Sequence, residues 1–163
     1  MKKSTFTILA LATFLVFVNF QLAEADIQKS NDDNFLGEKG KELFVQGGAI
    51  SISEKELQKH QVHFFHTFLS PERPIYFIVI RVDSNYQVLA NACRLCFQAK
   101  SGFYEEDGYL VCKVCGNRYR IEEVATVQEG CSPVPIETNL IAKEGKIVVS
   151  RESLEKVSSY FHF

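Results

Sequence analysis

The segments CRLC at residues 93–96, VCKVCG at 111–116 and GCSPVP at 130–135 decide how this chain is organised. All five cysteines of the protein lie within these segments. The first two segments each contain a Cys-x-x-Cys pair, and fifteen residues separate the pairs. This spacing is typical of a site in which four thiolates bind one metal centre. We therefore predict that Cys93, Cys96, Cys112 and Cys115 bind one metal centre and that Cys131 lies close by as a fifth thiol at the cofactor.

The thiols have two competing interpretations, a disulfide framework and free thiols. The N-terminal residues, described below, predict export, and the cysteines of an exported protein are usually oxidised, which supports disulfides. The odd number of cysteines and the closely spaced pairs favour metal binding instead, and Gly116 after the second pair allows a tight turn around an ion. A thioredoxin-type redox site would need one Cys-x-x-Cys pair at the start of a helix, and two paired knuckles do not match that pattern. No histidine follows either pair, so covalent haem attachment is excluded.

The residues leave the identity of the metal open. Four sulfur ligands suit zinc, a single iron ion or a [2Fe–2S] cluster. A chain exported unfolded cannot carry an assembled cluster, which favours zinc or iron acquired after export. A fifth cysteine on a loop with two prolines is more than a structural zinc ion needs. Cys131 could be an alternative ligand, a gate or a buried thiol.

The N-terminal residues predict export. Two lysines precede an apolar run over residues 6–20, and AEA at 23–25 matches a signal-peptidase site. We predict a signal peptide over 1–25, a flexible spacer over 26–43 and one metal-binding domain over 44–163. The protein would then act in the periplasm or cell envelope, anchored to the membrane if the signal is not cleaved. The net charge of −2 and the lack of a polybasic segment argue against a nucleic-acid partner.

The residue patterns predict an α+β fold with a mostly antiparallel sheet, zinc-ribbon-like cysteine knuckles and short flanking helices. The β-branched run Ile75–Val82 predicts a buried strand, and Tyr86–Ala92 predicts a second strand that leads into Cys93. The stretch Gly102–Val111 predicts a hairpin that places Cys112 opposite the first pair.

A repeated pattern flanks the cysteine segments. GAISIS at 48–53 and GKIVVS at 145–150 align at a constant offset of 97 residues. Each copy ends in a serine placed to cap a following helix, and the first of these helices would carry Leu57 inward. We predict one strand-plus-capped-helix unit used twice, with the copies packed near each other as the scaffold of the site. Chance recurrence of a short pattern is the alternative.

Three histidines are the only candidates besides the thiols for a second site. His60, His63 and His66 recur every third residue, within or just before the sequence VHFFHTF. That sequence predicts a strand, on which residues three apart face opposite sides. We interpret them as partly buried or surface histidines, with transient iron binding as the alternative. The chain has no Gly-rich phosphate loop, Gly-x-Ser-x-Gly elbow or His-Glu-x-x-His motif, so hydrolase chemistry finds no support.

Taken together, the three cysteine segments resemble the FtrD-like family, membrane iron–sulfur proteins associated with bacterial ferrous-iron transport. The family pattern is a Cys-x-x-Cys, a Gly-Tyr-type hairpin, a Val-Cys-x-x-Cys-Gly and a closing Gly-Gly-Cys-Asn-Pro-x-Pro. In this chain Phe103 follows the hairpin glycine, Glu129 replaces the first closing glycine and Ser132 replaces the asparagine. The similarity extends back through Ile75–Ala92. Larger members carry many transmembrane helices before this domain, whereas this chain has one apolar segment.

The resemblance implies an exported iron–sulfur or iron protein that passes electrons to or from an iron permease or another membrane redox component. It favours an electron carrier or binding protein over a stand-alone enzyme. Two other functions stay open from the residues. One is a zinc-stabilised, non-catalytic extracytoplasmic binding module, and the other is a disulfide-stapled adhesion or assembly protein.

Overall fold

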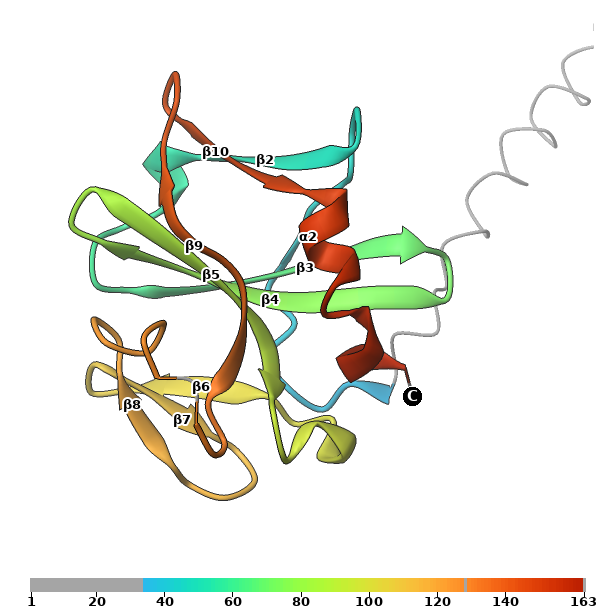
Figure 1. Cartoon of the computed structure of the whole chain (residues 1–163), viewed down its shortest axis with the longest axis vertical. Helices are drawn as coiled ribbons and strands as arrows, with labels where there is room; N and C mark the ends of the chain where they lie inside the picture. Colours follow the sequence, from blue (N-terminus) through green and yellow to red (C-terminus); the bar gives the residue numbers. More distant parts are fainter. Residues whose placement is uncertain (1–33, 128, 163) are drawn as a thin grey trace, which may run out of the picture. The chain divides into compact units, whose positions relative to one another are not determined.

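The chain is organised around a central β-sheet that separates two smaller sheets (Figure 1). The structure is a computed structural model that describes residues 34–127 and 129–162. The central sheet has five strands in the order β1-β3-β4-β5-β9, and every neighbouring pair is antiparallel except β1 with β3. Its strands are β1 (Lys41–Glu42), β3 (Val62–Ser70), β4 (Arg73–Val82), β5 (Asn85–Cys93) and β9 (Pro133–Ile141).

The two smaller sheets lie on either side of this sheet (Figure 1). One pairs β10 with β2, and the other has the order β6-β7-β8. Their strands are β2 (Ala49–Ser53), β10 (Lys146–Ser150), β6 (Phe103–Glu106), β7 (Tyr109–Cys112) and β8 (Arg118–Arg120).

The described residues are mostly β-strand, and their helices are short. The α-helix α2 spans only Arg151–Glu155, and the other helices are 3₁₀ turns. These turns are η2 (Glu54–Glu56), η3 (Phe97–Ala99) and η4 (Ser158–Phe161). The antiparallel sheet is confirmed, but the α+β class is not, because no described segment extends its helical pattern beyond about two turns. Within the described residues, no helix has the length and apolar character needed to cross a membrane.

The central strands bury both of their faces, which explains their continuous apolar sequences. Along β4 the side chains of Phe77 and Val79 enter one core, and those of Ile78 and Ile80 enter the other. Strand β5 continues this alternation and ends in Cys93, which belongs to the second core. A strand covered on both sides needs apolar residues at consecutive positions rather than at alternate ones. The predicted strands at Ile75–Val82 and Tyr86–Ala92 are therefore confirmed.

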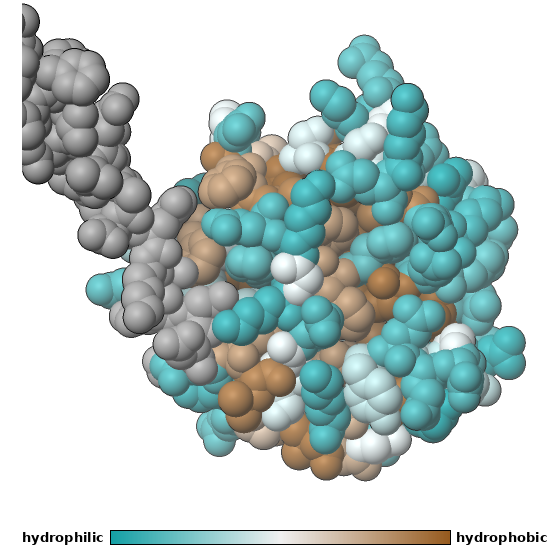
Figure 2. Space-filling view, turned by 180° about the vertical axis from the view of Figure 1, so that it is seen from behind, coloured by the Kyte–Doolittle hydropathy of each residue, from teal (hydrophilic) through white to brown (hydrophobic). Residues whose placement is uncertain are grey.

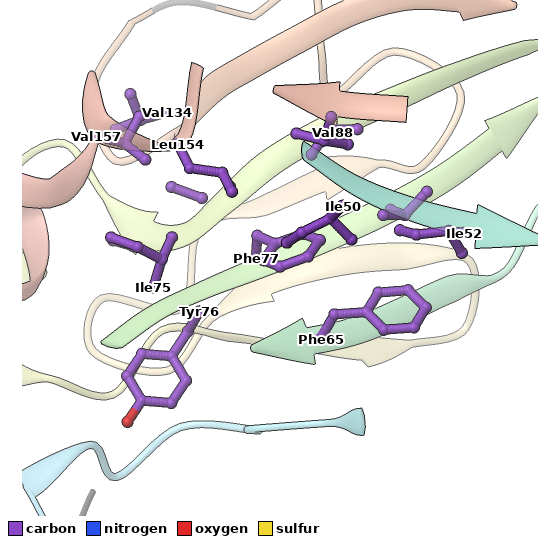
Figure 3. Close-up of a cluster of buried hydrophobic side chains, with 14 of the residues drawn as sticks. Ile50, Ile52, Phe65, Ile75, Tyr76, Phe77, Val88, Val134, Leu154 and Val157 are labelled. Carbon is purple, nitrogen blue, oxygen red and sulfur yellow. The ribbon is translucent and has the colours of Figure 1, made fainter. Parts of the chain in front are cut away.

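The larger core lies between the central sheet and the β2/β10 pair. Ile50, Phe77, Val88 and Leu154 meet there and are buried (Figure 3). Phe35 also belongs to this core, and its ring stacks on that of Tyr76 with centroids 3.9 Å apart. The packed part of the chain therefore begins before residue 44. The predicted signal peptide over 1–25 and the first part of the predicted spacer lie outside the described residues.

The two copies of the repeat pair with each other. Strands β2 and β10 run antiparallel, with Ile52 opposite Ile147 and Ile50 opposite Val149. This confirms that the copies pack together. Their buried side chains, however, enter the core on the face of the central sheet opposite to Cys93. The repeat thus supports the cysteine site only through the sheet and is not its direct scaffold.

The two repeat serines differ in their capping, which gives a matched test. The Oγ of Ser150 accepts a hydrogen bond of 3.0 Å from the N–H of Ser153, whereas Ser53 makes no side-chain cap to η2. We expect Ser150→Ala to lower the free energy of unfolding by about 1 kcal/mol, a typical cap contribution. Ser53→Ala should have almost no effect. Urea unfolding of both variants measures the difference, and equal losses would contradict this reading of the caps.

The first repeat helix is shorter than its sequence suggests. The segment after Ser53 forms one 3₁₀ turn, and Leu57 follows it with its side chain buried in the larger core. The inward position of Leu57 is therefore confirmed, although the capping hydrogen bond is absent. Without that bond, the first N–H groups of the turn lack a capping partner that would stabilise a longer helix. This is consistent with a turn that ends after three residues.

Candidate metal centre

Five cysteines from three segments of the chain converge where β5 ends and β9 begins. Cys93 ends β5, and Cys96 lies in the turn that follows it. Cys112 ends β7, and Cys115 lies in the turn between β7 and β8. Cys131 precedes β9, which pairs with β5 so that Pro133 lies opposite Cys93. Strand pairing thus brings together thiols that are up to 38 positions apart in sequence.

Each Cys-x-x-Cys pair folds into a turn whose backbone N–H groups point at the first sulfur. The N–H groups of Leu95 and Cys96 donate to the Sγ of Cys93 over 3.3 and 3.1 Å. The N–H groups at the same two positions of the second pair donate to the Sγ of Cys112. Such hydrogen bonds stabilise a thiolate and tune the potential of a bound iron centre. We call the two turns the knuckles, residues 93–96 and 112–115.

The sulfurs form two groups of three that share one member. The Sγ atoms of Cys93, Cys96 and Cys112 lie within 4.8 Å of one another, and so do those of Cys96, Cys115 and Cys131. The Sγ atoms of Cys96 and Cys131 are 3.5 Å apart. All five cysteines are free thiols in this structure. The predicted four-cysteine set is thus gathered in one place, with the fifth sulfur in contact with it.

The thiols differ in exposure and in acidity. Cys93, Cys112 and Cys131 are buried, and Cys115 is exposed. Burial raises the pKa of Cys112 to about 12. Hydrogen bonds with Cys115 and Cys96 raise the pKa of Cys131, and burial adds to the effect. The N–H of Asn117 instead lowers the pKa of Cys115. The site therefore has an accessible thiol with a lowered pKa, Cys115, and two buried thiols with raised pKa values, Cys112 and Cys131.

This asymmetry predicts an order of chemical modification in the metal-free, reduced protein. We expect iodoacetamide at neutral pH to modify Cys115 first, because the thiolate is the reactive form and this thiol is exposed. Cys112 and Cys131 should react last, and their rates should still rise at a pH where the rate at Cys115 has levelled off. Peptide mass spectrometry at successive times measures the order. Equal rates at all three positions would contradict the assignment.

The donor set fits a thiophilic metal, and a buried hydroxyl without a partner lies beside it. Thiolates are ligands for zinc, for iron and for iron–sulfur clusters. The Oγ of Ser132 is buried and has no hydrogen-bond partner among the described residues, and this residue directly follows Cys131. The Nε of Arg94, inside the first knuckle, is also without a partner there. Native proteins rarely leave buried polar groups unsatisfied unless an ion, a water molecule or another group completes them.

A buried asparagine that the sequence analysis did not single out attaches the second knuckle to the sheet. The side chain of Asn91 is fully buried; its Oδ1 accepts from the N–H of Phe103, and its Nδ2 donates to the carbonyl of Glu38, both over 2.8 Å. Phe103 begins β6 and pairs with Cys112 on β7. Gly102 passes so close that an added Cβ would lie 2.4 Å from the Asn91 Oδ1. A polar residue inside the apolar stretch VLANAC was the available signal, because buried amides are normally hydrogen-bonded.

The three histidines have separate partners. His63 accepts from the N–H of Gln58 through Nε2, and the Nδ1 of His66 lies 3.2 Å from the carbonyl of Lys39. His60 lies before β3 with its Nδ1 3.6 Å from a carboxylate oxygen of Glu122. The strand predicted for VHFFHTF is confirmed as β3. Among the described residues, the side-chain groups arranged closely enough to hold a metal contain cysteines and no histidine.

The fold and the site define a class: a mostly β, antiparallel domain with a cluster of cysteine thiols that could hold a metal ion. The particular family follows from comparison with known sequences. A family model described as membrane iron-sulfur containing protein FtrD-like matches residues 57–161, and the chain belongs to this family. The matched range contains all five cysteines. Searches of curated proteins and of solved structures gave no match.

Proposed function

We propose that this protein is an electron carrier that acts outside the cytoplasm and serves iron uptake. Its redox group would be an iron–sulfur cluster or a single iron ion. The observation that carries the proposal is the convergence of five free thiols from three chain segments at one place. Membership of the FtrD-like family, described as iron–sulfur containing membrane proteins, supports iron over other metals. Export and the exchange of electrons with an iron permease are parts of the same proposal.

In this proposal the two knuckles supply the ligands Cys93, Cys96, Cys112 and Cys115. Zinc-ribbon-like knuckles suit this role, because their N–H groups stabilise the first sulfur of each pair as a thiolate. Cys131 lies in contact with Cys96 and can replace or supplement a ligand. An iron centre, when bound, supplies one-electron exchange. The exposed Cys115 then forms the edge through which electrons enter and leave, and the buried thiols exclude water on the other side.

Anaerobic purification followed by metal analysis and visible absorption tests the proposal. We expect iron, a coloured protein, and a spectrum that bleaches on addition of one reducing equivalent per centre. Acid-labile sulfide distinguishes a cluster from a single iron ion. A colourless protein with one zinc ion per chain would overturn the electron-transfer role and support the zinc-stabilised binding module. A protein with no metal and about one free thiol after denaturation would support disulfides.

Cell fractionation tests the location. The predicted signal over residues 1–25 implies that the chain is recovered outside the cytoplasm, either soluble or with the membrane. Size determination by mass spectrometry shows whether cleavage follows AEA at 23–25. Recovery of the full-length chain in the cytoplasm would overturn this part of the proposal.

A further inference from the structure

The two knuckles carry the same sequence pattern, and its aliphatic residues are exposed in both. Each reads cysteine, cation, aliphatic residue, cysteine: Arg94 and Leu95 lie within the first, and Lys113 and Val114 within the second. Leu95 is 68% exposed and Val114 is 48% exposed, although both are aliphatic. Seen from behind, hydrophobic residues also reach the surface among hydrophilic ones at the lower end of the molecule (Figure 2).

The two aliphatic side chains flank the accessible edge of the thiol cluster. Leu95 directly precedes Cys96, and Val114 directly precedes Cys115. The sulfurs of these two cysteines lie within 4.8 Å of each other, and Cys115 is the exposed thiol of the cluster. Exposed apolar residues are informative when they gather beside a functional group, whereas single ones are common on any surface. Here Val114 adjoins the exposed thiol, and Leu95 adjoins the thiol whose sulfur lies within 4.8 Å of it.

Each knuckle contributes one positively charged side chain, Arg94 in the first and Lys113 in the second. Neither Arg94 nor Lys113 has an ion-pair partner among the described residues, and Lys113 is exposed. The cations on the adjacent strand β8 differ, because Arg118 pairs with Glu106 and Arg120 lies near two carboxylates. A thiolate metal centre is itself anionic, so unpaired cations beside it also favour the bound state. Lys113 is thus an exposed cation without an ion-pair partner in the described part of the chain, two positions before the exposed Cys115.

We propose that the knuckle face, formed by Arg94, Leu95, Lys113 and Val114 around the exposed Cys115, is the docking surface for a redox protein with an apolar centre and an acidic rim. This inference rests on the proposed electron-transfer function and names the kind of partner. Electron-transfer complexes bury small interfaces, commonly under about 1,200 Å², so two aliphatic contacts and two cations form a sizeable part of one. Complementary charge raises the association rate without requiring a tight complex.

Stopped-flow kinetics with a defined acidic carrier test the proposal. Reduced plant-type ferredoxin is mixed with the oxidised, metal-loaded protein; one electron leaves the ferredoxin cluster and reduces the thiolate centre of this protein. We expect the rate constant to saturate with ferredoxin concentration and the apparent association rate to fall as salt is added. Lys113→Glu should reduce the association rate at low salt at least about tenfold and flatten its salt dependence.

The apolar part of the surface is tested with a matched control. Leu95→Ser combined with Val114→Ser should raise the half-saturating ferredoxin concentration several-fold, whereas Val148→Ser should not. Val148 is 55% exposed on β10, on the other side of the central sheet from the cysteines. Reduction by dithionite should proceed at the same rate in all three proteins, which shows that the centre itself is intact.

Three outcomes separate the two proposals. If the purified protein holds no redox-active metal, the proposed function fails, and the docking surface as an electron-transfer site fails with it. If the centre is redox-active but the double variant behaves like Val148→Ser, only the docking surface is overturned. The same holds if ferredoxin shows no saturation or if the rate rises with salt. A selective loss in the knuckle variants supports the proposal.

Discussion

Replacing Cys96 with serine is expected to abolish stable metal binding. The Sγ of Cys96 belongs to both groups of sulfurs, so its loss leaves neither group with three thiols. Changes in residues around a metal that are not ligands already reduce affinity about 10–100-fold, and loss of a shared ligand should exceed that. Metal content after anaerobic purification and affinity from chelator competition measure the effect. Unchanged metal content in Cys96→Ser would contradict the proposed centre.

Cys131→Ser is the matched comparison for this variant. Both residues are cysteines of the same cluster with sulfurs 3.5 Å apart, and the substitution is the same. If the knuckles supply the four ligands, Cys131→Ser should retain one centre per chain, with a changed absorption spectrum or potential. If Cys131 is a ligand in the native centre, both variants should lose the metal. The pair therefore assigns the role of the fifth cysteine.

Metal binding should also depend on pH, since at least two thiols of the metal-free site have raised pKa values. The pKa of Cys112 is raised to about 12, and that of Cys131 is raised as well. A bound metal displaces the thiol protons, so lower pH favours the metal-free state. The apparent affinity should therefore fall as pH decreases, and chelator competition at two pH values gives the number of protons released. An affinity independent of pH would show that the ligands are not the protonated thiols.

Much of the fold could be predicted from local patterns, because those strands have distinctive sequences. Strand β4 is a continuous apolar run, which identifies a strand covered on both faces. Strand β9 has a different composition, with two prolines and several polar residues, and the sequence gives no comparable signal for it. Its place beside β5 depends on contacts between residues about 50 positions apart. The helices were overestimated because a serine in a capping position does not by itself produce a helix, as the single turn after Ser53 shows.

The thiols of the site could be predicted from spacing, but their arrangement could not. The pattern of two Cys-x-x-Cys pairs indicates convergence, because the intervening hairpin must return the chain. That Cys96, rather than another cysteine, is shared between two groups depends on how β9 places Cys131 against the first knuckle. The contribution of Asn91 was missed for a similar reason. Its two hydrogen-bond partners, Glu38 and Phe103, lie on either side of it in sequence and meet only in the folded chain.

The side-chain amide of Asn91 connects the stability of the core with the geometry of the metal site. The second knuckle belongs to a small three-stranded sheet, which needs an attachment to hold its thiols against the first knuckle. Strand β5 carries both the attachment and a thiol. Asn91 holds the start of β6, and Cys93 follows two residues later on the same strand. A change at Asn91 should therefore affect metal binding without altering any ligand.

Asn91→Ala is expected to destabilise the metal-free protein by about 1–3 kcal/mol, the typical cost of leaving one buried group, here the N–H of Phe103, without its partner. The N–H of Phe103 and the carbonyl of Glu38 both lose their partner in this variant. Metal affinity should fall as well, since the strand pair that carries Cys112 loses its attachment to β5. Urea unfolding of the metal-free protein and chelator competition on the loaded protein measure the two effects separately.

Gln87→Ala is the control for Asn91→Ala, because it removes another side-chain amide from strand β5. The Gln87 side chain bonds to Asn139 at the surface over 3.3 Å, so its loss should change the free energy of unfolding by less than about 0.5 kcal/mol. Gly102→Ala should resemble Asn91→Ala, since its Cβ would displace the same amide. If Asn91→Ala lowers stability but leaves metal affinity equal to that of Gln87→Ala, Asn91 is a core residue with no role in positioning the knuckle.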